Sequence, residues 1–416
     1  MAGSLRQRIT GTFADCQQLA GDRCPVWWFP SRDMKGATRP MVRKLGQCIA
    51  LVVALTLLLA PLFGASLARA QDATPQSPLV SCEPKPRPVP ESVDLVSAPE
   101  ESTPKEGLTT IDVGYVPITV VAPLYVAQEL GYFADEGLDV QLEAFPGGSD
   151  LVILTASGEL EASFAGAGPP LYNGIAQDLP VRIIAPGHTE GDPVATPLMI
   201  SRESCENGTI TSVSDLRGKK VSINARGSIE YLLNAALSTG GLTIDDIDLQ
   251  ILPFPDAVAG LESGAIDAAL ISEPLATKAE QDGIALRLVG SFPLNGMQPT
   301  AIIGNERWMN DHPDQAQAFV TGYMRASKLL AEGGLNDPAV QAIIEQYTGV
   351  PAALVAASVH PVFSADGQIS LDGLATLQTF LRARDQLEYE TDLDPAALIN
   401  NRFVTAAMES IDASVS

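Results

Sequence analysis

The sequence predicts an α/β protein built from two similar lobes, because one order of segments occurs twice along the chain. The first copy starts at Val113 and ends with SGELEASFAGAGPP at 157–170, and the second starts at Val221 and ends with SGAIDAALISEP at 263–274. In each copy, apolar runs of strand length alternate with apolar residues at helical i, i+3, i+4 spacing. The repeat therefore predicts one βαβαβ unit in each lobe.

The elements of the two copies follow the same order. In the first copy, a strand at 113–115 precedes a helical stretch and an extended run at 138–145; in the second, a strand at 221–223 precedes a helical stretch and an extended run at 249–254. Such units form mostly parallel sheets flanked by helices, and ligands bind at the carboxyl ends of the strands. Two units facing each other predict a clamp with a cleft between its lobes.

The amino-terminal region has the features of an export signal. Arg43 and Lys44 precede an uncharged, mostly apolar run at 46–68, and the small residues ending at Ala70 suit a signal peptidase. We interpret 41–70 as a signal peptide and expect the mature chain in the periplasm or at the cell surface. The apolar run is also long enough to span a bilayer, so an uncleaved anchor is the alternative.

The regions on either side of this signal carry no predicted domain. Residues 1–40 have no hydrophobic pattern, and we expect that the start codon has been assigned too far upstream. Residues 71–107 hold eight prolines among Ser, Thr, Glu and Asp, which predicts an extended linker. The 309 residues from Leu108 onward are enough for two domains with their own cores.

The chain is strongly acidic. Its 26 Lys and Arg against 50 Asp and Glu give a net charge of −24. Removal of 1–70 takes away nine basic and three acidic residues, which leaves 17 against 47 and a charge of −30. This balance argues against nucleic acid as a partner, because nucleic-acid binding requires basic surface.

Two cysteines remain in the exported chain, Cys82 in the linker and Cys205 in the polar stretch SRESCENGT. Outside the cytosol, an even number of cysteines is typical of a disulfide. Two free thiols are the alternative, because a linker cysteine has no evident reason to lie near Cys205.

The sequence contains no motif of a known catalytic centre. HExxH, GxSxG, a Walker loop and paired CxxC are all absent, and the exported chain holds only His188, His312 and His360. We interpret His312 and His360 as structural, and we expect no metal or cofactor, because the ligands for a metal are not clustered. A catalytic triad built from distant residues stays open.

Loops rich in Gly, Ser and Pro follow the predicted strands in both copies. Because these loops lie at strand ends, we expect them to meet at one cleft. The candidate ligand-binding residues are Tyr115, Pro117, Gly148, Ser149, Gly168, Pro169 and His188 in the first lobe and Arg226, Gly227, Ser228 and Glu273 in the second.

The two serines and the arginine predict the charge that the cleft prefers. Alone, Gly-Gly-Ser and Arg-Gly-Ser are ordinary turn and helix-capping sequences. Together, Ser149 and Ser228 as caps of two facing helices would aim N–H groups into the cleft, and Arg226 would add positive charge. This arrangement suits an anionic or strongly polar ligand.

Glu273 is unusual because a carboxylate at the end of the apolar strand AIDAALISEP is costly to bury without a partner. Two interpretations stay open. Glu273 either forms a salt bridge to Arg226 or caps a helix, or it accepts a hydrogen bond from a ligand amine or amide.

These segments resemble the solute-binding proteins of ABC importers for nitrate, taurine, aliphatic sulfonates and thiamine-precursor pyrimidines. The resemblance covers about 110–408 and rests on the phrases GYVPITVVAPLYVAQELGYFADEGLDV, FPGGSD, SGELEASFAGAGPP, DLRGKKVSINARGSIEYLLNAAL and LESGAIDAALISEP. The phrase around Tyr115 is similar to pyrimidine and riboflavin binders, whereas ARGSIEYLL is similar to taurine and sulfonate binders. Where the family usually has an aromatic residue before Glu-Pro, this chain has Ser272.

The resemblance implies a two-lobe clamp that closes by hinge rotation. It places 108–198 and 300–416 in one lobe and 199–299 in the other, with two chain crossings near 199–202 and 295–302. The later segment DHPDQAQAFVTGYMRASKLLAEG then forms an amphipathic helix that returns to the first lobe.

The function that the resemblance implies is a non-catalytic receptor, monomeric, that captures a small polar solute and delivers it to a membrane permease. The family also implies two alternatives, a binder of a pyrimidine or riboflavin-like heterocycle and a desulfinase-like hydrolase. The hydrolase would need a cysteine nucleophile in the cleft, and no predicted cleft loop contains one.

Overall fold

The computed structural model describes residues 81–83, 87–96, 107–294 and 296–415. All of them belong to one compact unit, Asp72–Ser416. The predicted signal peptide and the doubted start lie outside the described residues. Within these ranges, every helix is too short or too polar to cross a membrane.

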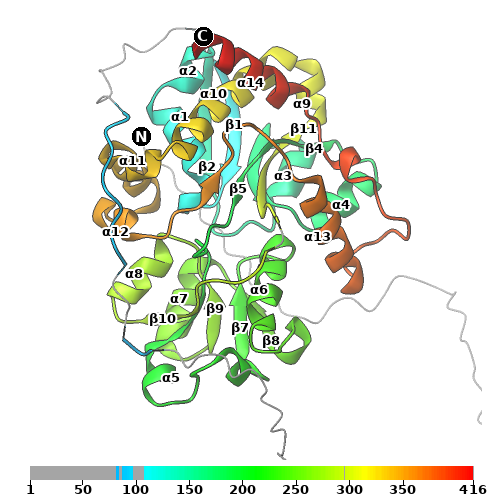
Figure 1. Ribbon diagram of the computed structural model, residues 1–416. Helices are drawn as coiled ribbons and strands as arrows, with labels where there is room; N and C mark the ends of the chain where they lie inside the picture. Colours follow the sequence, from blue (N-terminus) through cyan, green and yellow to red (C-terminus); the bar gives the residue numbers. More distant parts are fainter. Residues whose placement is uncertain (1–80, 84–86, 97–106, 295, 416) are drawn as a thin grey trace, which may run out of the picture. The chain divides into compact units, whose positions relative to one another are not determined.

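A five-stranded sheet forms the centre of the first lobe (Figure 1). Its order is β2-β1-β3-β11-β4; β1 runs parallel to β2 and β3, and β11 is antiparallel to β3 and β4. The strands are β1 (Thr109–Tyr115), β2 (Leu138–Ala144), β3 (Ala162–Gly166), β4 (Val181–Pro186) and β11 (Thr300–Asn305).

The sheet of the second lobe has the same design. Its order is β10-β6-β9-β7-β8; β7 runs parallel to β8 and β9, and β6 is antiparallel to β9 and β10. The strands are β6 (Leu198–Ser201), β7 (Lys220–Ile223), β8 (Asp248–Ile251), β9 (Ala268–Leu270) and β10 (Ala285–Val289). The repeated βαβαβ unit is therefore confirmed. A further short pair joins β5 (His188–Thr189) to β12 (Val362–Phe363).

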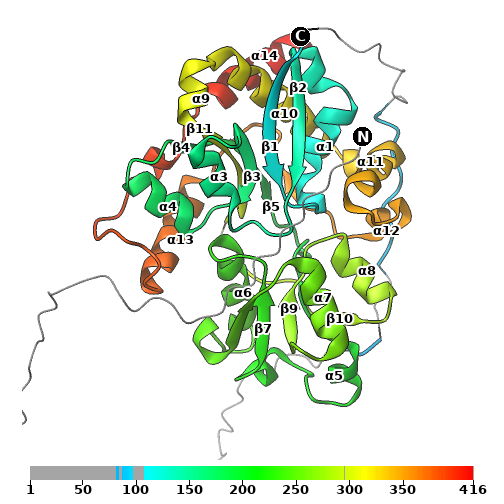
Figure 2. The ribbon, with the colours of Figure 1, turned by 180° about the vertical axis from the view of Figure 1, so that it is seen from behind.

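Helices cover both sheets (Figures 1 and 2). The helices linked to the first sheet are α1 (Ala122–Glu129), α2 (Tyr132–Asp135), α3 (Leu151–Ser157), α4 (Pro169–Ala176), α9 (Glu306–Asp311), α10 (Pro313–Ala331), α11 (Pro338–Thr348), α12 (Ala352–Ala357), α13 (Leu371–Ala383) and α14 (Arg402–Val415). Those linked to the second are α5 (Arg202–Glu206), α6 (Ser228–Ser238), α7 (Phe254–Ser263) and α8 (Leu275–Gln281). Short 3-10 turns are η1 (Thr119–Val121), η2 (Val213–Leu216), η3 (Ile244–Asp246), η4 (Gly334–Asn336) and η5 (Pro395–Leu398).

Equivalent glycines end the second helix of each repeat. Gly158 follows α3 with φ of 86°, and Gly264 follows α7 with φ of 70°. Residues other than glycine rarely adopt this left-handed conformation, so the Ser-Gly pair in each copy stops the helix before the third strand.

The crossings between the lobes lie partly elsewhere than the sequence indicates. The chain leaves the first sheet after Pro186 and enters the second at Leu198, ahead of the expected 199–202. The run Leu198–Ser201 is apolar because it forms β6, which pairs on both sides with β9 and β10. The return crossing lies between Val289 and Thr300.

Candidate functional site

A cavity of about 420 Å³ lies at the carboxyl ends of the strands of both sheets. The first lobe supplies loops after β1, β2, β3 and β4, and the second supplies loops after β7, β8 and β9. The lining residues are Val116, Ile118, Val120, Val121, Gly148, Ser149, Val152, Phe164, Ala165, Gly166, Gly168, Pro169, Pro170, His188, Thr196, Asn224, Ala225, Arg226, Ser228, Ile229, Ile251, Phe254, Ser272, Pro299 and Thr300.

The structure brings most of the candidate residues to this cavity and leaves others outside its lining. Those that line it are Gly148, Ser149, Gly168, Pro169, His188, Arg226 and Ser228. Those that do not are Tyr115, Pro117, Gly227 and Glu273. The loops therefore converge as their positions at strand ends require, while individual side chains point in directions that strand position does not set.

The two lobes touch beside the cavity through Ser228. Its N–H donates to the carbonyl of Ala167 at 2.8 Å, and its hydroxyl donates to the carbonyl of Pro299 at 2.5 Å. Gly227 allows this contact: a Cβ added there would lie 2.5 Å from the Cα of Gly168, and φ is 107°. The N–H of Ser228 therefore joins the second lobe to the first, and its hydroxyl binds the return crossing.

The expectation of two serine-capped helices is wrong. Ser228 is the first residue of α6, with Gly227 at the N-cap, and α3 begins at Leu151 with Asp150 at the N-cap. Neither helix start has a side-chain capping hydrogen bond. Ser149 is exposed at the cavity, whereas the hydroxyl of Ser228 donates to the carbonyl of Pro299 in the return crossing.

Arg226 is half-exposed at the cavity and pairs with Glu230 at 3.2 Å. Glu230 is fully buried and also accepts from Arg384 at 2.7 Å and from Gln386 at 2.9 Å. Two guanidinium groups thus share one buried carboxylate, and of the two it is Arg226 that lines the cavity. Arg384 in turn also pairs with Asp245 at 3.0 Å.

Glu273 belongs to a salt bridge outside the cavity. Its side chain is fully buried and accepts from Arg287 at 2.6 Å, from the N–H and hydroxyl of Thr277 at 3.0 Å, and from the N–H of Val359 at 3.1 Å. The salt bridge is made to Arg287 on β10, not to Arg226. These partners use the carboxylate oxygens, so the geometry does not offer Glu273 to a ligand.

Tyr115 and Pro117 also lie outside the lining. Tyr115 is 5% exposed and meets Tyr125 edge to face at 5.3 Å between ring centroids, with Tyr347 stacked on Tyr125 at 4.3 Å. Tyr115 lies on the same face of β1 as Val113, and both are buried. Burial also raises the pKa of the Tyr115 hydroxyl. The neighbours of Pro117, Val116 and Ile118, line the cavity instead.

His188 and Thr300 form the polar end of the cavity near the crossings. The Nδ1 atom of His188 lies 2.7 Å from the hydroxyl of Thr300, and Nε2 lies 3.6 Å from the carboxylate of Glu190. Burial raises the pKa of Glu190, but His188, Thr196 and the N–H of Ala195 outweigh burial and hold this pKa below its ordinary value.

Sequence reasoning missed the apolar walls of the cavity. Phe164, Ile229, Ile251 and Phe254 all line it, yet each belongs to an apolar run that equally predicts core. Thr300 was missed as well, although it stands in a predicted crossing. The one signal that could have identified such residues is a position directly beside a predicted cleft loop, as for Ile229 after Ser228.

The described residues hold no cysteine thiol at the cavity, because Cys82 and Cys205 form a disulfide with an S–S distance of 2.02 Å. Across the same residues, His, Cys, Asp and Glu form no group of three or more that could hold a metal ion. The polar chemistry of the cavity consists of hydroxyl, amide, imidazole and guanidinium groups.

The sequence is similar to those of several curated proteins. The chain is 23% identical over 254 residues to the nitrate/nitrite binding protein NrtA of Nostoc sp., covering 58% of each chain. It is 26% identical over 239 residues to the bicarbonate transport ATP-binding protein CmpC of Synechocystis sp., covering 53% of this chain but only 35% of that relative. The chain therefore covers less than two thirds of these relatives.

Solved structures with low sequence identity confirm the two-lobed fold. The alkanesulfonate-binding protein SsuA from Xanthomonas axonopodis pv. citri, bound to MOPS, matches 70% of this chain and 98% of its own with a TM-score of 0.58 at 20% identity. The desulfurization enzyme DSZB matches 72% of this chain and 99% of its own with a TM-score of 0.51 at 18% identity. The model of the NMT1-like family matches residues 104–345, more than half of the sequence, and the chain is a member of that family.

Proposed function

We propose that this protein is the solute-binding component of an ABC importer and that it captures a small organic anion with an apolar body, such as an alkanesulfonate. In this proposal the mature chain acts outside the cytoplasm and releases its ligand to a membrane permease. The observation that carries the proposal is the chemistry of the cavity between the two sheets.

The charge of the cavity supports an anionic group on the ligand. The chain carries −24, yet no Asp or Glu stands among the described lining residues, and Arg226 is their one Lys or Arg. The long-range repulsion of anions by the acidic surface is screened over about 8 Å at physiological ionic strength. The groups that line the cavity then determine which ligand charge it prefers. Arg226, with His188 and the hydroxyls, favours an anion.

The apolar walls support an organic body on the ligand. Most lining residues are aliphatic or aromatic, and 420 Å³ lies in the range of cavities that bind small organic molecules, about 300–1,000 Å³. Nitrate or bicarbonate would leave most of this wall without contact. An alkyl chain would gain about 0.8 kcal/mol for each buried CH₂.

Two alternatives are less well supported. A flat heterocycle would lack the expected stacking partner, because Tyr115 is packed against Tyr125. The likeness to DSZB suggests a desulfinase-like hydrolase as the second alternative, and such an enzyme would need a thiol nucleophile. The described cysteines are bonded to each other and do not line the cavity.

A thermal-shift screen of residues 71–416 tests the proposal. Hexanesulfonate should raise the melting temperature, because a ligand that binds only the folded state stabilises it. Sodium nitrate and sodium bicarbonate at equal ionic strength should raise it less. Hexanol serves as a control for the apolar body alone. A shift with nitrate or bicarbonate but none with hexanesulfonate would contradict the proposal.

A further inference from the structure

A peptide segment before the first strand contacts both lobes. Described residues 81–83 and 87–96, here named the outer strap, run from α5 past α8 and α12 to α11 (Figures 1 and 2). The sequence predicts an extended linker here, and the structure assigns these residues neither helix nor strand. Most of these residues are exposed, but Cys82, Arg87 and Val96 make specific bonds to the two lobes.

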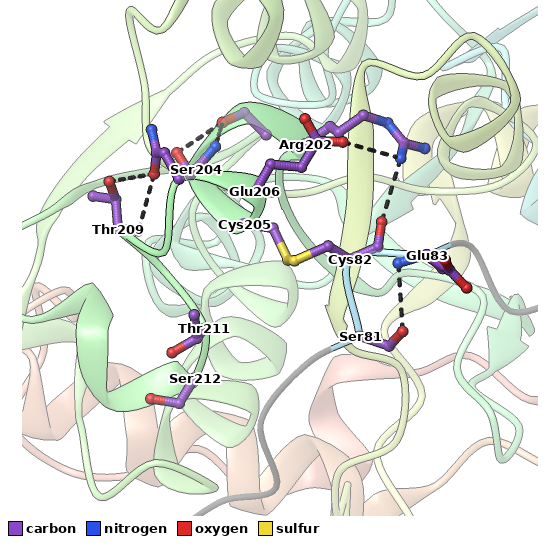
Figure 3. The surroundings of a disulfide bond; sticks show 12 residues. Ser81, Cys82, Glu83, Arg202, Ser204, Cys205, Glu206, Thr209, Thr211 and Ser212 are labelled. Carbon is purple, nitrogen blue, oxygen red and sulfur yellow. Dashed lines mark hydrogen bonds and ion pairs between the residues drawn. A yellow bond between two sulfur atoms is a disulfide. The ribbon is translucent and has the colours of Figure 1, made fainter.

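A covalent bond attaches the outer strap to the second lobe. Cys82 is joined to Cys205 of α5, which is 3% exposed, across a sequence separation of 123 residues (Figure 3). Arg202, at the start of α5, donates from Nη1 to the carbonyl of Cys82 at 3.3 Å and from Nε to the carbonyl of Gly283 at 3.1 Å. The strap is therefore fixed at this end.

Arg87 attaches the middle of the outer strap to α8. Its guanidinium donates to Glu280 at 2.8 Å and to the hydroxyl of Thr277 at 2.9 Å, and its Nε reaches the carbonyl of Ala357 in α12 at 3.5 Å. Glu280 also accepts from Arg287 at 3.0 Å. Arg87 thus supplies the second cation of a mostly buried cluster at the junction of the lobes.

Asp337 attaches the other end of the outer strap to the first lobe. One carboxylate oxygen accepts from the N–H groups of Leu95 at 2.7 Å and Val96 at 2.8 Å, and the N–H of Val93 donates to the carbonyl of Asn336 at 3.2 Å. Asp337 is 2% exposed and also caps α11. Hydrogen bonds to a buried carboxylate are stronger than neutral ones.

We propose that the outer strap restrains the separation of the two lobes, with the Cys82–Cys205 disulfide as its anchor. A rotation about the crossings that moves α8 away from α11 lengthens the path between the two attachments, so it must stretch the strap or detach one end. The disulfide cannot detach, and the bonds at Asp337 therefore oppose rotation. This restraint is a property of the chain itself and does not depend on which ligand the cavity takes.

Two amides report the separation of the lobes without any ligand. The N–H of Ser228 donates to Ala167, and the N–H of Thr119 donates to Glu273 at 2.9 Å, so each bond crosses between lobes. Such amides exchange with deuterium when the lobes part. Amides bonded within one lobe, those of Thr109 and Asp248, serve as internal controls.

The test compares residue-resolved hydrogen exchange of the exported chain with that of a Cys82→Ser/Cys205→Ser variant and of Arg87→Gln, which keeps the disulfide. We expect the Ser228 and Thr119 amides to exchange on the order of tenfold faster in the double variant, the factor for losing one or two net hydrogen bonds. Arg87→Gln should give a smaller increase. Arg217→Gln, which breaks an exposed pair within the second lobe, is the matched control and should change neither amide.

Two results would overturn the proposal. In the first, the amides of Leu95 and Val96 exchange faster, which shows a released strap, while those of Ser228 and Thr119 do not. In the second, the amides of Thr109 and Asp248 accelerate equally, which shows general destabilisation. If the double variant does not fold, a dithiol that reduces the native disulfide to two thiols and is itself oxidised provides the same comparison.

Discussion

Two glutamates of the second lobe, Glu230 and Glu273, are both fully buried and both paired with arginine, but their partners lie in different parts of the molecule. The arginine that holds Glu273 is Arg287 of β10, in the same lobe. Glu230 is held by Arg384 and Gln386, which follow α13. The amide of Asn173 in α4 donates to the carbonyl of Gln386 at 3.0 Å and ties this segment to the first lobe.

The two glutamates therefore depend to different degrees on contact between the lobes. When the lobes part, Glu273 loses the N–H of Val359 but keeps Arg287, whereas Glu230 loses both Arg384 and Gln386 and keeps Arg226. A buried carboxylate without its partner is costly. The Glu230 cluster therefore favours the closed arrangement, and Arg226 couples it to the cavity.

The largest effect is expected from Glu273→Ala. The substitution leaves Arg287 buried with one carboxylate fewer, and breaking a buried pair costs roughly 3–5 kcal/mol of unfolding free energy. Urea denaturation monitored by circular dichroism measures this loss. Glu262→Ala, at an exposed position of α7, is the matched control. An equal, small loss of unfolding free energy in both variants would show that the buried pair of Glu273 with Arg287 does not stabilise the fold.

The next effect is expected from Arg226→Ala. Glu230 keeps Arg384 and Gln386 in this variant, so the fold should hold, while an anionic ligand loses the guanidinium of Arg226. We expect hexanesulfonate to bind about 1.5–3 kcal/mol more weakly, the range for a hydrogen bond to a charged group. Calorimetry measures the affinity, with Arg217→Ala as the control for net charge. An unchanged affinity for hexanesulfonate would show that Arg226 does not bind the ligand.

A smaller effect is expected from Gly227→Ala. The added Cβ meets Gly168 only when the lobes are closed, so ligand affinity should fall by roughly tenfold, near the low end of overpacking costs. Gly241→Ala is the control, because Gly241 has φ of 69° but open space around it. Equal affinity in the two variants would show that backbone conformation, rather than contact between the lobes, sets the result.

The smallest effect is expected from the pH dependence of Glu190. Its pKa is lowered in the folded chain, so ionised Glu190 contributes stability above its ordinary pKa of 4.5, and this stability is lost as pH falls through the folded value. The melting temperature of Glu190→Gln should therefore fall less between pH 6 and pH 3.5 than that of the unmodified chain. An equal fall of the melting temperature in the two proteins would contradict a lowered pKa of Glu190.

The sequence predicted the parts of the molecule that depend on local periodicity. Alternating and helical spacing located β1, β2, β7 and β8. The loops at strand ends led to the cavity, since sheet topology places those ends together. These inferences need only the nearest residues in the chain.

Side-chain partners distant in sequence could not be predicted. Glu273 was recognised as needing a partner, but nothing in the chain named Arg287. Glu230, four residues after Arg226, had the spacing of an ordinary exposed helical pair. The sequence leaves open whether the Ser228 hydroxyl caps its helix or donates to a distant segment, and the structure gives Pro299 as its acceptor. In each case the answer depends on packing between elements that spacing does not fix.

Titration calorimetry of ethanesulfonate, butanesulfonate and hexanesulfonate into the exported chain tests most directly whether the cavity takes an anion with an apolar body. The account predicts that affinity rises with each added CH₂, by up to about 0.8 kcal/mol, until the cavity is filled. It also predicts weaker binding of nitrate than of any member of the series. Affinity that is independent of chain length, or nitrate bound more tightly than hexanesulfonate, would contradict it.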